Sequence, residues 1–338
     1  MRVAILSPIT WRTPPRKYGP WEQVASTIAE GLVARGISVS LFATGDSLTQ
    51  AKLESVCKVP IGEDQTLDPK VWECLHISHL MEKAKEFDII HNHFDFLPLT
   101  YSALIDTPMI TTIHGFSSPQ ILPVYKKYNK TSAYISISKS DRHRDLSYLQ
   151  TIHHGINPED FPFIKAKEDY LLCFGRIHPD KGTHLAIEIA LAAGLPLKIA
   201  GLIQDETYFN TLIKPYVDRG QVLYAGNAGS VIRNRLLGNA RALLHPISFD
   251  EPFGLSVIEA MMSGTPVVAF ERGSMSELIV NGKTGYLVKD VPEAVSAIQK
   301  IEAINPQDCH DHAVRHFNQD RMIDEYVEAY KKVLAKKI

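Results

Sequence analysis

The stretch FDEPFGLSVIEA, residues 249–260, decides the fold of this 338-residue chain. The apolar runs ALLHPIS and SGTPVVAF on its two sides are typical of buried strands. Between them the stretch places Glu251 before an expected helix and Glu259 inside that helix, with a Phe-Gly pair at the turn. A strand that leads through a tight turn into a helix indicates a parallel α/β sheet. Such sheets bind their ligands at the carboxyl ends of the strands.

The same alternation of strand and helix extends along the chain. One helix is predicted over residues 21–36, because Val24, Ile28 and Leu32 fall on one face and Gly36 follows as a cap. The pattern therefore predicts two α/β units, each a doubly wound parallel sheet of the Rossmann-like type. The predicted strands are residues 3–8, 38–44, 87–93, 108–115 and 132–138 in the first half, and 170–175, 196–201, 221–226, 241–246 and 265–270 in the second.

The composition excludes several classes of protein. Lys and Arg total 36 against 38 Asp and Glu, so a surface built to bind nucleic acid is not expected. The four cysteines are scattered without a C-x-x-C pair, which favours free thiols in a reducing compartment. No apolar run reaches about 18 residues, and the first residues show no signal-peptide pattern. We expect a soluble, cytoplasmic protein.

Two cations follow the first predicted strand of the second half, in CFGRIHPDKG, residues 173–182. Gly175 turns the chain, and Arg176 and Lys181 lie five positions apart before a helix. An arginine fork and a lysine at the mouth of a parallel sheet suit a diphosphate, although a solvated loop with ordinary surface charges has the same composition.

The helix expected after the Phe-Gly turn offers a second anion site. The free N–H groups of the helix that begins near Gly254 would face an anion, because a helix start carries unpaired donors and a partial positive charge. Glu259, inside the helix, is placed to accept from the diol of a ribose, and Glu251 to accept from a sugar hydroxyl near the phosphates. The alternative is that Glu259 caps locally and Glu251 is a loop charge.

GRIHPDKG followed by DEPFGLSVIEAMMSGTPVVAF resembles the retaining glycosyltransferases of family 4, which have the two-lobed GT-B fold with a central cleft. The resemblance covers nearly the whole chain. It implies an N-terminal acceptor-side domain over residues 1–160 and a C-terminal nucleotide-sugar donor domain over 161–315. A closing helix over 316–338 would pack back on the N-terminal domain. The Pro- and charge-rich residues 157–169 are interpreted as the linker.

The resemblance also implies roles for individual residues. Arg176 and Lys181 would hold the diphosphate, Glu259 the ribose and Glu251 the donor sugar. His114, in TIHG at residues 112–115, matches the family histidine beside the donor sugar. The resemblance thus makes His114, Arg176, Lys181 and Glu251 catalytic. Their neighbours Gly175, Phe253, Gly254 and Leu255 would complete the donor site.

Two loops of the first half are expected to face the ligands. KYGPWEQ, residues 17–23, matches the family's glycine-rich loop, but Pro20 replaces its second glycine and has no N–H to offer. Gly19 remains the phosphate-binding candidate. Arg12, Arg16 and Lys17 in the same loop suit an anionic acceptor or are simply solvated.

A histidine-rich stretch, HNHFD at residues 91–95, allows two readings. His91, His93 and Asp95 alternate on one face if the strand continues, which resembles a metal site. Further ligands at fixed spacing are missing, and GT-B transferases generally need no bound metal. We therefore expect no metal, with His93 and Asp95 as acceptor-side residues.

The predicted function is metal-independent transfer of a hexose-type sugar from a nucleoside-diphosphate sugar to an acceptor hydroxyl, with retention of configuration and no cofactor. The acceptor would be a carbohydrate, a sugar phosphate or a lipid-linked glycan. VYKKYNK, residues 124–130, and the Lys-rich C-terminus permit weak contact with an anionic membrane, so the cytoplasmic face of the membrane is a second expected location. The alternatives are a nucleotide-sugar epimerase and a non-catalytic nucleotide-sugar-binding subunit.

Overall fold

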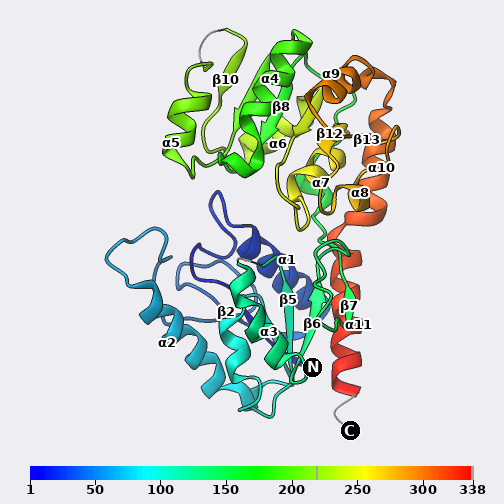
Figure 1. Cartoon of the computed structure of the whole chain (residues 1–338). Helices are drawn as coiled ribbons and strands as arrows, with labels where there is room; N and C mark the ends of the chain where they lie inside the picture. The colour runs from blue at the N-terminus through cyan, green and yellow to red at the C-terminus, as the bar shows by residue number, and fades with distance from the viewer. Residues whose placement is uncertain (117, 218–219, 336–338) are drawn as a thin grey trace. The chain divides into compact units, whose positions relative to one another are not determined.

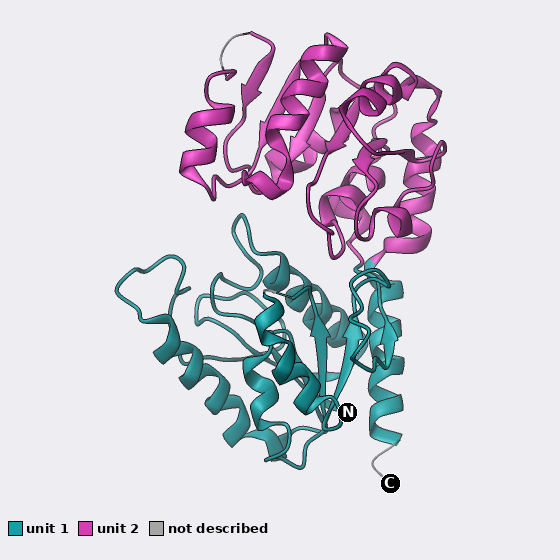
Figure 2. Cartoon of the chain, viewed as in Figure 1, with its two compact units in different colours: residues 1–154, 319–338 teal, residues 155–318 magenta. Residues whose placement is uncertain are grey.

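The computed structural model describes residues 1–116, 118–217 and 220–335, which form two structural units. Unit 1 consists of residues 1–154 and 319–338, and unit 2 of residues 155–318 (Figure 2). Each unit is built on its own all-parallel sheet (Figure 1). The two predicted Rossmann-like sheets are therefore confirmed.

The sheet of unit 1 has seven parallel strands in the order β3-β2-β1-β4-β5-β6-β7. Its strands are β1 (Arg2–Leu6), β2 (Ser38–Phe42), β3 (Lys52–Glu54), β4 (Ile89–Asn92), β5 (Met109–Ile113), β6 (Ser132–Ser136) and β7 (Gln150–Thr151). Its α-helices are α1 (Pro20–Ala34), α2 (Pro69–Glu82), α3 (Leu122–Tyr128) and α11 (Gln319–Ala335).

Both faces of this sheet are buried, because successive side chains of a strand point to opposite faces. Val3 and Ile5 of β1 join a core formed with α1 and α11. Ala4 and Leu6 join a second core formed with α2 and with Tyr125 of α3. The helices therefore cover the sheet as two layers.

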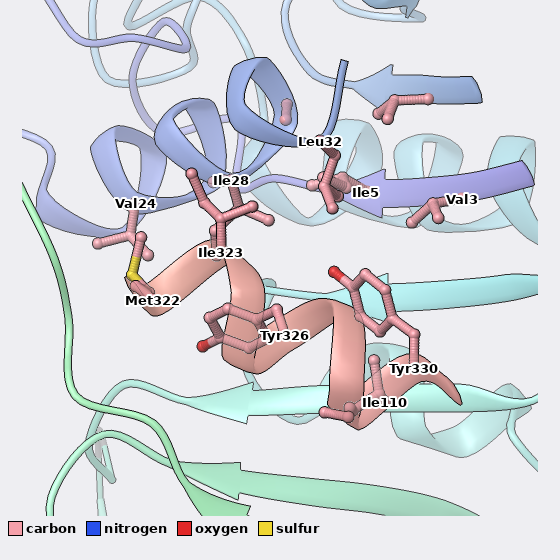
Figure 3. Packing of buried hydrophobic residues seen from close by; sticks show 14 of the residues in the cluster. Val3, Ile5, Val24, Ile28, Leu32, Ile110, Met322, Ile323, Tyr326 and Tyr330 are labelled. Atoms are coloured by element: carbon pink, nitrogen blue, oxygen red, sulfur yellow. The ribbon is translucent and has the colours of Figure 1, made fainter. Parts of the chain in front are cut away.

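The C-terminal helix α11 completes the first of these cores (Figure 3). Tyr326 and Tyr330 are fully buried, and Ile323 packs on α1 at Gly31. A Cβ at position 31 would lie 2.0 Å from Ile323 Cδ1, so any larger residue there would force the Ile323 side chain to shift. No helix of the described residues is long and apolar enough to cross a bilayer.

The sheet of unit 2 has six parallel strands in the order β10-β9-β8-β11-β12-β13. Its strands are β8 (Leu171–Phe174), β9 (Leu197–Ala200), β10 (Val222–Tyr224), β11 (Ala242–His245), β12 (Val267–Phe270) and β13 (Gly285–Val288). Its α-helices are α4 (Thr183–Ala193), α5 (Glu206–Tyr208), α6 (Ser230–Asn239), α7 (Leu255–Met262), α8 (Met275–Leu278), α9 (Val291–Gln299) and α10 (Pro306–Phe317).

The chain passes from one unit to the other earlier than the Pro- and charge-rich stretch suggests. The boundaries fall at 154/155 and 318/319, and residues 157–169 belong to unit 2. Ile164 N–H donates to Ser263 O over 3.1 Å, and Lys167 Nζ donates to Gly238 O over 2.8 Å. Residues 157–169, interpreted from the sequence as the linker, therefore lie within unit 2, where these bonds fix them to the ends of α6 and α7.

Candidate functional site

Two residues predicted to share a site, 70 positions apart, meet at the carboxyl ends of β8 and β11. Lys181 Nζ donates to Glu251 Oε2, and the two side chains are only 16% and 12% exposed. The ammonium also lies 4.6 Å from the centroid of the Phe249 ring. An ion pair this enclosed, where strands of a parallel sheet end, matches the place where such folds bind ligands.

The carboxyl of Glu251 is ionised at neutral pH. Burial alone would raise its pKa, but the His245 imidazole and the Lys181 charge outweigh burial and hold the pKa at about 2. His245 Nε2 lies 3.5 Å from the same carboxylate oxygen. Glu251 is therefore a fixed negative charge that orients Lys181.

The guanidinium of Arg176 is held at the same sheet edge. It donates to Asp180 Oδ2 over 3.1 Å and to Gln204 Oε1. The backbone at Gly175 approaches the end of β9 closely here. A Cβ at position 201 would lie 1.8 Å from Gly175 O, and Gly201 has no Cβ. Asp180 balances part of the charge of Arg176, so the side chain is positioned before any ligand arrives.

The start of α7 is built by a glycine and clamped by a neighbouring turn. Gly254, the N-cap, has φ +98°, a left-handed conformation that favours glycine. Ser274 N–H donates to Glu251 O over 3.0 Å, and Ser274 Oγ donates to Phe253 O over 2.5 Å. The helix start beside Glu251 is therefore rigid, and Leu255, its first residue, is partly exposed.

The ring of Phe253 does not face this site. It is buried, and its centroid lies 6.2 Å from that of Phe317 in an edge-to-face contact. A donor-binding role predicted for Phe253 can only involve its backbone.

Sequence reasoning missed the partner of Glu259. Arg233 Nη1 of α6 lies 3.3 Å from Glu259 Oε1 on α7. Burial raises the pKa of Glu259, and the Arg233 charge opposes that rise. Arg233 carries no motif and lies 26 positions before Glu259, so only the fold shows the pairing.

In unit 1 the substitution of proline for glycine at position 20 has a simple explanation. Pro20 is the first residue of α1, and Gly19, with φ +154°, is its N-cap. The first N–H groups of a helix have no partner in the helix, so proline costs nothing there as far as the helix is concerned. A Cβ at Gly19 would lie 2.7 Å from Pro15 Cβ, so the loop packs tightly on this glycine.

The three cations predicted to face an anionic acceptor, Arg12, Arg16 and Lys17, are not equally free to bind one. Arg16 is bonded to Asp46 over 2.9 Å and to Glu63 over 2.7 Å. Arg12 Nε donates to Pro14 O over 2.9 Å, whereas Lys17 is exposed. An anionic acceptor would have to compete with two carboxylates for Arg16.

The histidine-rich stretch does not form the metal site that its alternation suggests. Strand β4 ends at Asn92, and Asp95 has φ +58°, so Asp95 leaves the face of His91 and His93. The Asp95 carboxylate accepts from Tyr125 O–H over 2.5 Å. In the described parts of the chain, no group of three His, Cys, Asp or Glu residues is placed to hold a metal ion.

The predicted site histidine His114 lies at the end of β5 in unit 1 and is buried. Its Nε2 is 2.9 Å from His93 Nδ1, and its ring stacks on those of Trp21 and His154 with centroids 5.4 and 5.2 Å apart. His93 is itself fully buried, and its ring contacts His114. It therefore has no exposed surface to offer the acceptor that the sequence predicted for it.

A second residue that the sequence did not single out is Glu22, near the start of α1. Its side chain is buried, and its Oε1 accepts from Trp11 N–H over 3.1 Å. Burial raises the pKa of Glu22 to about 7, although the backbone hydrogen bonds that it accepts lower it. The folded protein thus holds a proton on Glu22 at pH values where an exposed glutamate is ionised.

This burial gives a pH-dependent prediction. A folded-state pKa raised from 4.5 to about 7 contributes stability that is complete below pH 4.5 and is lost as the pH rises through 7. Glu22→Gln, which stands in for the protonated acid, should exceed the wild type in unfolding free energy by about 3 kcal/mol at pH 8, with the difference shrinking towards pH 4.5. Urea unfolding at both pH values tests this, with exposed Glu82→Gln as the control. An equal effect of both variants, or a constant gap for Glu22→Gln, would contradict the prediction.

Comparisons with known proteins agree with this architecture. Residues 22–160 match the family described as Glycosyltransferase Family 4, and residues 158–315 match Glycosyl transferases group 1. The uncharacterized glycosyltransferase MJ1607 of Methanocaldococcus jannaschii is 26% identical over 85% of this chain and 85% of its own length.

Two solved structures share the fold over nearly the whole chain. Sucrose-phosphate synthase from Thermosynechococcus elongatus has a TM-score of 0.81 at 18% identity, covering 99% of this chain and 100% of that one. HepE of Anabaena, in complex with UDP and glucose, has a TM-score of 0.75 at 20% identity, covering 98% and 100%. The two family matches together cover residues 22–315. The two parallel sheets and the solved structures show the GT-B fold. The chain is therefore a family 4 glycosyltransferase, with the family given by the two sequence matches.

Proposed function

We propose that this glycosyltransferase moves a hexose from a nucleoside-diphosphate sugar to an acceptor hydroxyl, with retention of configuration and without a metal ion or cofactor. The observation that carries the proposal is the enclosed Lys181–Glu251 pair, with Arg176 beside β8 and the start of α7 in the same unit. Cations, helix N–H groups and a carboxylate are the groups that a sugar diphosphate requires.

The diphosphate would be held by positive groups only. Arg176 supplies a planar fork, Lys181 a point charge, and the start of α7 its unpaired N–H groups. Contacts from Gly175 and the backbone of residues 253–255 would complete this set, and Gly19 of unit 1 is the proposed contact from the glycine-rich loop.

Two carboxylates would then bind the two ends of the donor, one the ribose and the other the transferred sugar. Glu259, paired with Arg233, would accept hydrogen bonds from the ribose diol. Glu251, whose low pKa keeps it ionised, would accept from a hydroxyl of the sugar. His114 is proposed to contact the donor sugar, by the family resemblance.

The chemical step needs the leaving phosphate to be stabilised and the sugar to be carried through an oxocarbenium-like transition state. Arg176 and Lys181 would stabilise the charge on the phosphate as the glycosidic bond breaks. The phosphate would in turn take the proton of the acceptor hydroxyl as it attacks from the same face. This route retains the anomeric configuration without a covalent sugar–enzyme bond.

The substrates are narrowed only in class. HepE was solved with UDP and glucose, so UDP-hexoses are the first donors to test. The acceptor is proposed to be a carbohydrate, a sugar phosphate or a lipid-linked glycan. Exposed Lys127 in α3, beside Lys126 that pairs with Asp145 over 2.5 Å, would give at most weak contact with an anionic membrane at the cytoplasmic face.

The experiment is turnover of UDP-, GDP-, ADP- and TDP-hexoses with and without EDTA, with the anomeric proton of the product followed by NMR. We expect slow hydrolysis without acceptor, retained configuration and no effect of EDTA. An inverted product would contradict the mechanism. An epimerised donor would support the epimerase instead, and binding without turnover in any acceptor mixture would support a non-catalytic subunit.

Arg233 provides a separate prediction for the ribose contact. Arg233→Met removes the cation beside Glu259, so the pKa of that buried carboxyl should rise and its protonated form should accept hydrogen bonds poorly. We expect nucleoside diphosphate affinity to fall about tenfold at pH 7, or roughly 1.4 kcal/mol, and to recover in part at pH 9. Calorimetric titration measures this, with Arg235→Met, an exposed position on the same helix, as the control. A loss that is independent of pH would contradict the assigned cause.

A further inference from the structure

A chain of buried polar side chains runs through the core of unit 1 from His114 to the C-terminal helix. His114 Nε2 lies 2.9 Å from His93 Nδ1, and His93 Nε2 lies 3.3 Å from His91 Nδ1. The same His91 Nδ1 lies 2.7 Å from Tyr330 Oη of α11. Figure 3 shows Tyr330 and its neighbour Tyr326 on the side of α11 that packs against the sheet.

The three histidines are neutral. Each has a pKa well below its ordinary value, because burial removes water from the ring and the neighbouring histidines disfavour a further charge. A neutral imidazole carries one N–H and one bare nitrogen. Every ring can therefore donate at one nitrogen and accept at the other, and the order of the protons can be deduced from the ends of the chain.

Tyr330 fixes that order. Its hydroxyl is fully buried, and His91 Nδ1 is its one hydrogen-bond partner within the described residues. A buried O–H that donates to nothing costs about 1–3 kcal/mol. Tyr326 is equally buried, and Thr112 Oγ1 is its one hydrogen-bond partner within the described residues, so the same rule applied to Tyr326 gives the opposite order. Among the described residues, that opposite order leaves two buried donors without an acceptor, Tyr330 O–H and His114 Nδ1–H, whereas the order set by Tyr330 leaves only Tyr326 O–H. Tyr330 therefore donates to His91 Nδ1, which must be bare. The proton of His91 is then on Nε2 and is donated to Thr112 Oγ1 over 2.8 Å.

The next two rings follow. A bare His93 Nε2 would put two lone pairs face to face at 3.3 Å, so His93 carries its proton on Nε2. This N–H is directed at His91 Nδ1 and shares its single lone pair with the shorter bond from Tyr330. His93 Nδ1 is then bare and accepts from His114 Nε2–H. This leaves His114 Nδ1 without a proton. That atom is buried and has no hydrogen-bond partner in the part of the chain that the structure describes.

We propose that Tyr330, acting through His91 and His93, locks His114 in the tautomer that has its proton on Nε2 and a bare, accepting Nδ1. Tyr330, His91 and His93 are positioning residues, and the stacked rings of Trp21 and His154 hold the plane of His114. The locked tautomer can accept a hydrogen bond from a ligand O–H at Nδ1 but cannot donate one there. Its use in sugar transfer rests on the proposed function, whereas the tautomer itself does not.

The test is the tautomer of His114 by long-range proton–nitrogen NMR, with the His114 signals assigned from their absence in His114→Gln. In the wild type we expect the Nδ1 resonance of an unprotonated nitrogen and the Nε2 resonance of a protonated one. Tyr330→Phe removes the donor that sets the order, so a second His114 population with a protonated Nδ1 should appear. Tyr326→Phe is the matched control, because it removes the buried hydroxyl at the other end of the network, which bonds to Thr112 Oγ1 over 2.9 Å and would set the opposite order. We expect Tyr326→Phe to leave the His114 spectrum unchanged.

The outcomes separate the possibilities. A wild-type His114 with its proton on Nδ1 would overturn the proposal, even if Tyr330→Phe fails to fold. A folded Tyr330→Phe protein with an unchanged His114 spectrum would also overturn it, as would an equal change in Tyr326→Phe. None of these results requires turnover, so they are independent of a failure to bind or transfer a sugar.

Discussion

Arg176→Ala is expected to slow sugar transfer by about 10²–10³-fold, because it removes a preorganised cation from the site where charge develops on the leaving phosphate. The side chain is partly buried, held by Asp180 and Gln204, and is not part of the hydrophobic core. Unfolding should therefore change little. Steady-state rates and thermal unfolding of the same preparations measure the two effects.

The matched control is Arg241→Ala. Arg241 is an arginine of unit 2 that, like Arg176, is held by two side-chain partners, and in Arg241 both partners are carboxylates. Arg241 is bonded to Asp169 over 2.6 Å and to Glu302 over 2.9 Å and has no assigned part in the donor site. We expect its transfer rate to stay within about twofold of the wild type. Near-normal turnover by Arg176→Ala would remove Arg176 from its proposed role.

Glu251→Gln is expected to change transfer and nucleotide binding in opposite directions. Transfer should fall about 100-fold, since the glutamine has no charge to support the sugar in its positively charged transition state. Binding of the free nucleoside diphosphate should be equal or tighter, because Lys181 no longer shares its charge with a carboxylate. The free energy of unfolding of the unliganded protein should fall by up to about 3 kcal/mol, because a partly buried ion pair has been broken.

Titration calorimetry and steady-state rates check this prediction, with Glu168→Gln as the control. Glu168 pairs with Lys198 over 3.4 Å and is half exposed, so its loss should alter neither quantity. A parallel fall in diphosphate affinity and in transfer for Glu251→Gln would place Glu251 on the nucleotide and not on the sugar.

The strands formed by apolar runs could be predicted from the sequence, and three strands at sheet edges could not. All ten predicted strands are present within two residues at either end, because continuous apolar runs mark strands that are covered on both faces. Three strands were missed: β3 (Lys52–Glu54), β7 (Gln150–Thr151) and β13 (Gly285–Val288). Each lies at an edge of its sheet, where one side of the strand is unpaired and a short or polar segment suffices.

Part of the candidate site could also be deduced from the sequence. Lys181 and Glu251 stand at strand ends of one parallel sheet, and the topology alone brings such ends together. Arg233 and Glu22 could not be found in this way, because their importance comes from burial and from one neighbour each. The same limit applies to Phe253, whose motif position suggested a ligand and whose ring packs in the core.

The central claim is that unit 2 holds a nucleoside diphosphate, and calorimetric titration with UDP, GDP, ADP and TDP tests it most directly. The wild type should bind one of the four with clear preference, and Arg176→Ala and Glu259→Ala should each weaken that binding at least tenfold, or by about 1.4 kcal/mol. If none of the four binds, or if both variants bind as tightly as the wild type, the proposed donor site is wrong.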